Sequence, residues 1–337
     1  MRFLRIVLAV ILTAALLYIA RENSRGRPEH YTHSENGYTF EMTSVPKAYV
    51  GDTVRLVVGI DGPLGKDLRP VIRLLQSGRD ADTPLRRYGS LPLALADSLT
   101  GRYHYLLKAG KIGSKLRYYF EVRDGTGGLR ARFVNDGQSF ILKFVGEVPS
   151  WILILHIVLM FATVFFVVMG SLHGIDLIRA GGSVRPMAKA YFWAVVVTFL
   201  GGYPFGFAMN WYTFGTVWEG VPFGTDATDN KTQLLFVYLL MVMLAGLGSL
   251  TKGRLGRNVY RPRALGRLGA LGFVVMLAIY LVPHSIQFSP GLTRTVCWSF
   301  IGLVAAVYLI GWWRSRSWKG TPAVPQEGTE PERGGRK

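Results

Sequence analysis

Hydrophobic residues in this chain form long continuous runs near both ends and a different, alternating pattern between them. The first run, FLRIVLAVILTAALLYIA, covers residues 3–20, and the runs after residue 149 are separated by short loops rich in arginine. A helix needs roughly 20 apolar residues to cross the hydrocarbon core of a bilayer. The pattern therefore predicts six membrane crossings, at residues 1–20, 150–171, 188–208, 232–250, 268–286 and 295–313.

Residues 21–149 lack such runs and alternate between apolar and polar side chains instead. In SKLRYYFEVRD, Leu116, Tyr118, Phe120 and Val122 fall on one face, and Arg117, Tyr119, Glu121 and Arg123 fall on the other. This period of two is typical of a half-buried strand, and Gly-containing turn sequences separate the strands. The predicted fold is a membrane α-helical bundle with an inserted all-β extracytoplasmic sandwich at 21–149.

Two of these predicted strands carry a family resemblance. YVGDTVRLVVGI at 49–60 and GSKLRYYFEVRDGTGG at 113–128 resemble early and late strands of bacterial extracytoplasmic domains of the immunoglobulin or fibronectin type III kind. The resemblance covers residues 36–145. It implies an architecture but no binding residue, because this region has no cysteine for the immunoglobulin disulfide and no tryptophan. Domains of this kind commonly bind partners or act as spacers.

Charge predicts the orientation of the chain in the membrane. The net charge of +18 is distributed over loops, the β domain and a tail at 314–337, so it indicates a basic membrane protein and not a nucleic-acid binder. The segment 251–267 holds six basic residues and no acid, whereas residues 210–232 hold three acids and one lysine. By the positive-inside rule, 251–267 and both termini are cytoplasmic and the sandwich lies outside. Together with the resemblance, this indicates a bacterial inner-membrane protein with a disordered cytoplasmic tail at 314–337.

An external loop rich in aromatic residues is predicted at 201–232. Pro204 among glycines should end or kink the preceding helix, and we expect the loop to be ordered and to contact the sandwich. Its aromatic side chains suit either the headgroup belt of a membrane protein or a surface that docks a partner. The candidate docking residues are Trp211, Tyr212, Trp218, Glu219, Asp226 and Asp229. Asp226, Asp229 and Asn230 are also calcium-type oxygen donors, but a capped helix start at Asp229 and Asn230 is the better explanation.

Histidine supplies the candidate chemistry of the membrane part. His156 and His284 are predicted at similar depths in two crossings, where ionisable groups are costly and often functional. Such a pair could bind a haem iron, another transition metal or a quinone oxygen, and the alternatives are interhelical hydrogen bonds or interfacial positions. A haem would be noncovalent, of the b type, because no Cys-x-x-Cys-His sequence is present. The single cysteine, Cys297, is predicted to be a buried thiol.

No catalytic or nucleotide-binding motif occurs in the chain, which favours a non-enzymatic function. We predict an accessory or scaffold subunit that docks other membrane or periplasmic proteins through its sandwich and aromatic loop. Four glycines are placed for lateral packing of its helices against such proteins: Gly246, Gly248, Gly269 and Gly272. An electron-transfer protein that binds haem or quinone, and a sensor or transporter of a small ligand, remain alternatives.

Overall fold

The computed structural model describes residues 2–24, 29–63, 67–77, 86–97, 101–135, 137–282 and 288–316. Two compact units divide the chain. The helical unit contains Met1–Ser24, Leu155–Phe205 and Trp218–Lys337. The β-rich unit contains Arg25–Ile154 and also Gly206–Val217, which come from the membrane half of the sequence.

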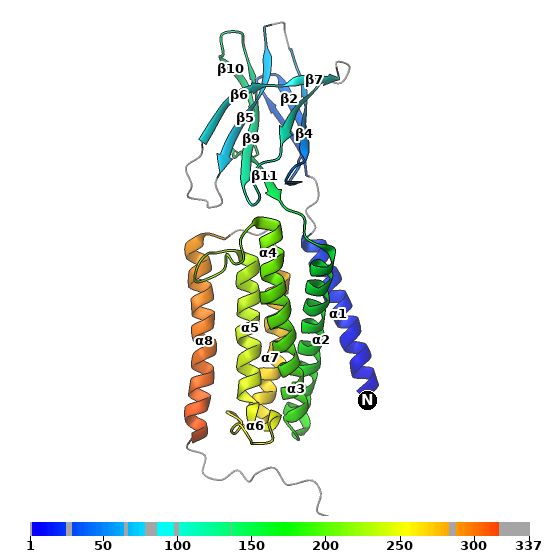
Figure 1. Cartoon of the computed structure of the whole chain (residues 1–337), viewed down its shortest axis with the longest axis vertical. Helices are drawn as coiled ribbons and strands as arrows, with labels where there is room; N and C mark the ends of the chain where they lie inside the picture. The colour runs from blue at the N-terminus through cyan, green and yellow to red at the C-terminus, as the bar shows by residue number, and fades with distance from the viewer. Residues whose placement is uncertain are drawn as a thin grey trace, which may run out of the picture. The chain divides into compact units, whose positions relative to one another are not determined.

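Two sheets make up the β-rich unit (Figure 1). The first has the order β1(His30–Glu35), β2(Tyr38–Thr43), β4(Thr53–Asp61), β8(Arg102–Lys108), β7(Ala94–Asp97). The second has the order β3(Lys47–Tyr49), β11(Phe140–Val145), β9(Lys115–Arg123), β5(Arg69–Ser77), β6(Arg86–Pro92). β10(Leu129–Phe133) also pairs with β9. β3 runs parallel to β11, and the other pairs are antiparallel.

One cluster of buried side chains draws from both sheets. Phe40, Leu56 and Val58 come from the first sheet, and Ile72 and Leu142 from the second. The alternation predicted for β9 is confirmed on its core face, where all four apolar residues are buried. Burial of this shared apolar surface is the main stabilising term for the unit.

The helical unit contains most of the long helices (Figure 1). They are α1(Arg2–Ser24), α2(Ser150–Ala180), whose first residues belong to the β-rich unit, α3(Arg185–Leu200), α5(Ala227–Ala245), the short α6(Leu247–Leu250), α7(Pro262–Leu281) and α8(Pro290–Arg316). Four helices in the described part of the chain are long and apolar enough to cross a membrane: Ser150–Ala180, Arg185–Phe214, Pro262–Leu281 and Pro290–Arg316. These four helices support the assignment of the chain to the membrane proteins.

Six crossings are not confirmed by the structure. In α1 the apolar stretch covers only Phe3–Ile19. In α5 the first turns carry polar residues, among them Lys231 and Gln233, which shorten its apolar part. Helix boundaries also differ from those predicted, since the helix expected at 150–171 extends to Ala180.

Pro204 was predicted to end or kink its helix, and of these two outcomes the structure excludes the end. A π-helical turn, Gly201–Phe205, includes Pro204 and connects α3 to α4(Gly206–Phe214). Proline has no N–H to donate, and the wider π turn tolerates the missing hydrogen bond where a regular helix would be interrupted. The irregular segment therefore begins at Gly215, several residues later than expected.

Glycines allow close packing between helices of this unit. A Cβ on Gly174 of α2 would lie 2.7 Å from the Gly266 O atom of α7, which shows that the two backbones are nearly in contact. The Tyr191 ring of α3 packs against Gly170 and Gly272, and its hydroxyl donates a hydrogen bond to the Gly269 carbonyl at 2.5 Å. Van der Waals packing of this kind stabilises helix association where no hydrophobic driving force exists.

The glycines predicted to face other membrane proteins are buried inside the chain itself. A Cβ on Gly269 would lie 2.4 Å from Met187 Sδ, and one on Gly272 would lie 2.1 Å from Tyr191 Oη. Gly246 approaches Ala188, and Gly248 approaches the backbone of Arg257. All four glycines therefore pack against other parts of the same helical unit, and the prediction that they face other membrane proteins is wrong.

Candidate functional site

Helix α4 is attached to the β-rich unit by a backbone hydrogen bond. The Gly146 N–H, directly after β11, donates to the Thr213 carbonyl at 3.0 Å. A Cβ on Gly146 would lie 2.2 Å from the Tyr212 carbonyl oxygen, so this approach requires glycine. The predicted contact between the aromatic loop and the β domain is thereby confirmed for Gly206–Val217.

Large apolar side chains of α4 point away from the protein. Trp211 is 57% exposed and Tyr212 is 41% exposed, and the helix has no fully buried residue. Gly215 ends the helix with a positive φ of 68°, and its N–H donates to the Trp211 carbonyl at 2.8 Å. Val217, just beyond, is half exposed. The result is an ordered apolar surface, which we call the α4 surface: Trp211, Tyr212, Phe214 and Val217.

The other predicted docking residues belong to the helical unit. Trp218 stacks on Tyr203, with ring centroids 5.7 Å apart. Asp226 is the N-cap of α5, because its carboxylate accepts hydrogen bonds from the Thr228 and Asp229 N–H groups at 2.8 and 3.0 Å. A capped helix start is thus present, but it lies three residues before the predicted position, because Asp226 is the cap and Asp229 lies in the first turn.

Asp229 has a structural role that contradicts its assignment to a docking surface. It is only 7% exposed, and its carboxylate accepts a hydrogen bond from the Glu219 N–H at 2.6 Å. The neighbouring Asn230 Oδ1 accepts another from the Val221 N–H at 2.8 Å. These side chains hold the 218–226 segment against the start of α5. Glu219 and Asp226 remain exposed, so the predicted set is divided between two units and reduced by one residue.

His156 on α2 is held by the π turn. Its Nδ1 lies 3.0 Å from the Gly201 carbonyl oxygen. Because a carbonyl oxygen only accepts hydrogen bonds, Nδ1 carries the proton and Nε2 keeps its lone pair. Histidines that bind metals commonly have this arrangement. The expected second histidine, His284, lies outside the described residues, so the pairing stays a prediction.

The described residues contain no group of three or more His, Cys, Asp and Glu side chains that could hold a metal ion. Cys297 is a buried free thiol, as predicted. His173, on the same helix as His156, lies near Asp176, with 3.8 Å between Nδ1 and Oδ2. His156 is therefore a hydrogen-bonded imidazole of the membrane part, and among the described residues it belongs to no group of three or more possible metal ligands.

A buried carboxylate with three arginines was missed by the sequence interpretation. Glu121 was assigned to the solvent face of β9, but it is 0% exposed, because Arg73, Arg123 and Arg132 cover it. Their closest contacts to its carboxylate are 3.1, 2.7 and 3.1 Å. Burial alone would raise the pKa of Glu121, but the hydrogen bonds and charges of Arg123 and Arg73 outweigh it and lower the pKa.

Three guanidinium groups around one carboxylate leave an excess of two positive charges on this face of the second sheet. Arg132 also lies over the Tyr119 ring, 5.3 Å from its centroid. Alternation alone could not find this group, because the arginines come from three strands whose register is not readable from sequence.

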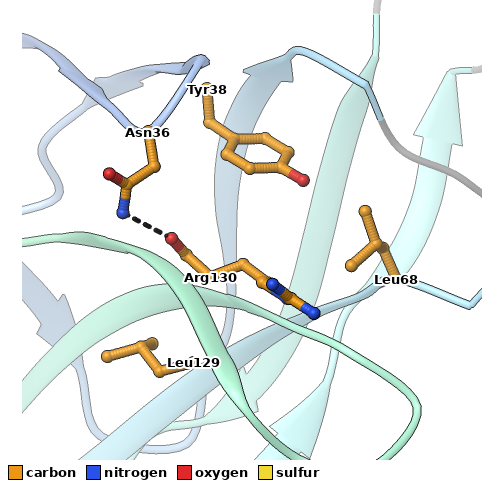
Figure 2. Close-up of a pocket in the computed structure, with 5 residues that line it drawn as sticks. All are labelled: Asn36, Tyr38, Leu68, Leu129 and Arg130. Atoms are coloured by element: carbon orange, nitrogen blue, oxygen red, sulfur yellow. Dashed lines mark hydrogen bonds between the residues drawn. The ribbon is translucent and has the colours of Figure 1, made fainter.

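A cleft of about 490 Å³ lies elsewhere in the β-rich unit (Figure 2). Figure 2 shows that Asn36 reaches the Arg130 backbone, and its Nδ2 donates to the carbonyl at 2.8 Å. Tyr38, Leu68 and Leu129 form the remaining lining. Arg130 is also paired with Asp124, at 3.1 Å. The described residues that line the cleft include no nucleophile paired with a base.

Comparison with known proteins adds no family to this description. No family model matches the chain, and no curated protein shows significant similarity to it. The functional argument therefore rests on the geometry of the α4 surface, the arginine face and His156.

Proposed function

We propose that this chain is a non-enzymatic membrane accessory protein that docks a protein partner on its β-rich unit. The β-rich unit supplies an ordered apolar surface on α4 and, at another place on its second sheet, a cluster of three arginines around Glu121, and the four long apolar helices supply the membrane part. Tryptophan, tyrosine and arginine are the residues most enriched at the centres of protein interfaces.

The strand order supports an immunoglobulin-like sandwich as the architecture of the docking unit. Immunoglobulin domains have one sheet of strands A, B, E and D and a second built on C, F and G. Here β2, β4, β8 and β7 follow the first order, and β5, β9 and β11 follow the second. β10 and β11 share one edge of β9, because β11 pairs with residues 115–118 and β10 with residues 120–123.

We place the β-rich unit outside a bacterial inner membrane and the basic segment 251–267 in the cytoplasm. The positive-inside rule supports this orientation. Partners would then be periplasmic proteins or the outer parts of other membrane proteins.

The observation that carries the docking proposal is the attachment of α4 to β11 through Gly146 and Thr213. A hydrogen bond of 3.0 Å fixes the helix in the β-rich unit while more than half of the Trp211 side chain stays exposed. Because Trp211, Tyr212 and Phe214 lie at the end of the apolar helix Arg185–Phe214, either lipid headgroups or a partner must cover them, and we propose the partner.

Photocrosslinking in native membranes tests the proposal. Benzoylphenylalanine would replace Trp211 in the full chain, and Trp298 of α8, which is 51% exposed, would be the matched control. We expect a discrete protein adduct at position 211 and lipid adducts alone at 298. The absence of a protein adduct at 211, or the same adduct at both positions, would favour a simple headgroup belt.

A second candidate function, haem or quinone binding for electron transfer, rests on the orientation of His156, whose Nδ1 lies 3.0 Å from the Gly201 carbonyl oxygen and whose Nε2 would be the ligand atom. We expect the purified full chain to show a Soret band if His156 and His284 hold a haem, and His156→Ala to remove it. A colourless preparation that is free of metal and quinone and still crosslinks at position 211 would eliminate this candidate and leave the docking function intact.

A further inference from the structure

A second cleft, of about 250 Å³, lies in the helical unit, where α5 ends and α8 ends. Its apolar wall includes Leu244, Val259 and Tyr308. Arg257 of the α6–α7 connection and Arg316 of α8 supply its charged lining. The cleft thus combines an apolar wall with two guanidinium groups near one end of α8. Helix α8 is one of the four that could cross a membrane.

The connection that carries Arg257 is fixed on both sides of this residue. Asn258 accepts a hydrogen bond from the Ser249 N–H at 2.8 Å and donates one to Ser249 Oγ at 2.7 Å. The Val259 N–H donates to the Ala245 carbonyl at 2.9 Å. Gly248 packs against the backbone of Arg257, where a Cβ would lie 2.5 Å from its carbonyl carbon. These contacts fix the backbone at Arg257 before any ligand binds.

Aromatic contacts position the other wall of the cleft. The Arg316 guanidinium lies 3.8 Å from the centroid of the Trp312 ring. Stacking occupies the face of the guanidinium and leaves its N–H donors at the edge for an acceptor. Tyr260 donates a hydrogen bond to the Val307 carbonyl and packs over Gly311, which ties the connection to α8.

In the described part of the chain, no carboxylate is paired with Arg257 or Arg316. The sequence between Asp229 and Glu327 contains no Asp or Glu, and within residues 230–316 it includes ten Lys and Arg residues. Among the described residues, the recorded ion pairs do not involve Arg257 or Arg316. The elements that form the cleft therefore carry an uncompensated positive charge that fits an anion.

We propose that this cleft binds the phosphate headgroup of an anionic phospholipid. Arginine guanidinium groups donate paired hydrogen bonds to phosphate oxygens, and basic pockets at the ends of membrane helices bind anionic headgroups. The apolar wall of the cleft, which includes Leu244, Leu247 and Val259, suits the start of the acyl chains. An inorganic phosphate would use the arginines but gain nothing from this apolar wall.

Native mass spectrometry of the full chain in neutral detergent tests the site. The protein would be titrated with phosphatidylglycerol, and phosphatidylcholine would serve as the neutral comparison. We expect one tightly retained phosphatidylglycerol, and Arg257→Gln with Arg316→Gln should weaken its binding by about tenfold or more. The matched control, Arg254→Gln with Arg263→Gln, removes the same charge from exposed positions outside the cleft and should leave binding within about twofold.

Arg257→Lys with Arg316→Lys keeps the charge but loses the paired hydrogen bonds, so an intermediate affinity is expected. If this Lys variant elutes from size-exclusion chromatography as a folded protein, misfolding does not explain its weaker binding. Unchanged binding in the Gln variant, or an equal loss in the control variant, would overturn the proposal.

Two further experiments test whether inorganic phosphate or the C-terminal tail occupies the cleft instead of a lipid. Displacement of the lipid by millimolar inorganic phosphate would assign the cleft to a free anion and overturn the lipid assignment. The tail contains Glu327, Glu330 and Glu332. If phosphatidylglycerol bound only after these three were changed to Gln, the tail would be the occupant and the proposal would be overturned.

Discussion

Gly174→Ala should destabilise the helical unit, although alanine is the better helix former. The added methyl would lie 2.7 Å from both the Ala270 nitrogen and the Gly266 carbonyl oxygen, and 3.1 Å from the Gly269 carbonyl carbon. All three are backbone atoms of α7, so no side chain can rotate away to make room. Relief requires α2 and α7 to move apart.

The size of the effect follows from two opposing terms. Alanine in place of glycine inside a helix gains about 0.5–1 kcal/mol. Overpacking of a close contact costs about 1–3 kcal/mol, since a gap of roughly 0.5 Å already loses about a quarter of the dispersion attraction along the interface. The packing term is larger, and we expect the free energy of unfolding to fall by about 1–2 kcal/mol.

Gly302→Ala provides the matched control for this variant. Gly302 lies inside α8, and nothing lies within 4 Å of the position where its Cβ would be. This variant should therefore keep the gain of about 0.5–1 kcal/mol. Reversible unfolding of the purified full chain in mixed detergent micelles, followed by circular dichroism, measures both variants. If Gly174→Ala stabilised the protein as much as Gly302→Ala, the close approach of α2 and α7 would be refuted.

Three other predictions concern the β-rich unit, the start of α5 and the topology. Glu121→Gln leaves three guanidinium groups without their carboxylate. We expect it to lower the free energy of unfolding at pH 7, measured by urea titration, by about 2–3 kcal/mol. The control Glu41→Gln, at an exposed position, should change this free energy little. The pKa of Glu121 is lowered below 4.5 in the folded protein, so the loss of unfolding free energy relative to wild type should be complete above pH 4.5 and should shrink as the pH falls through the folded pKa. A loss that acid does not change would contradict this origin. Asp226→Ala should cost about 1 kcal/mol in thermal unfolding through loss of the α5 cap, and Asp226→Asn should restore most of it, so equal losses in both would argue against capping. In a cysteine-free background, an impermeant thiol reagent applied to intact cells should label Phe223→Cys and spare Asn258→Cys, and the opposite result would invert the proposed orientation.

Sequence patterns predicted the features that depend on local periodicity. The alternation at 114–124 predicted the core face of β9, and the continuous apolar runs predicted the long helices. Period and length report how much surface an element buries, and both are visible in a single segment. Asp229 and Asn230 likewise predicted a helix start to within a few residues, because a helix cap is formed by residues close in sequence, and the observed cap is Asp226.

Features that depend on distant partners could not be read in this way. Glu121 follows the solvent-facing positions of β9 in its alternation, and only the register of β5 and β10 brings Arg73 and Arg132 over it. Pro204 was expected to end or kink a helix, because sequence shows that proline lacks an N–H donor but does not show the π turn that accommodates it. The membrane glycines were assigned outward for the same reason, since a small residue shows that something approaches closely without showing which chain supplies it.

The α4 surface illustrates both cases within one short segment. Its aromatic residues and the need to order them were evident from sequence, because exposed apolar side chains require either a lipid or a protein neighbour. The position of Thr213 against Gly146 was not evident, since the hydrogen bond joins residues 67 positions apart and depends on the absence of a Cβ at one of them. That single contact assigns Trp211 and Tyr212 to the β-rich unit, while Trp218 and Asp229 belong to the helical unit. Variants at Trp211 therefore probe the docking function, and variants at Asp229 probe the folding of the helical unit.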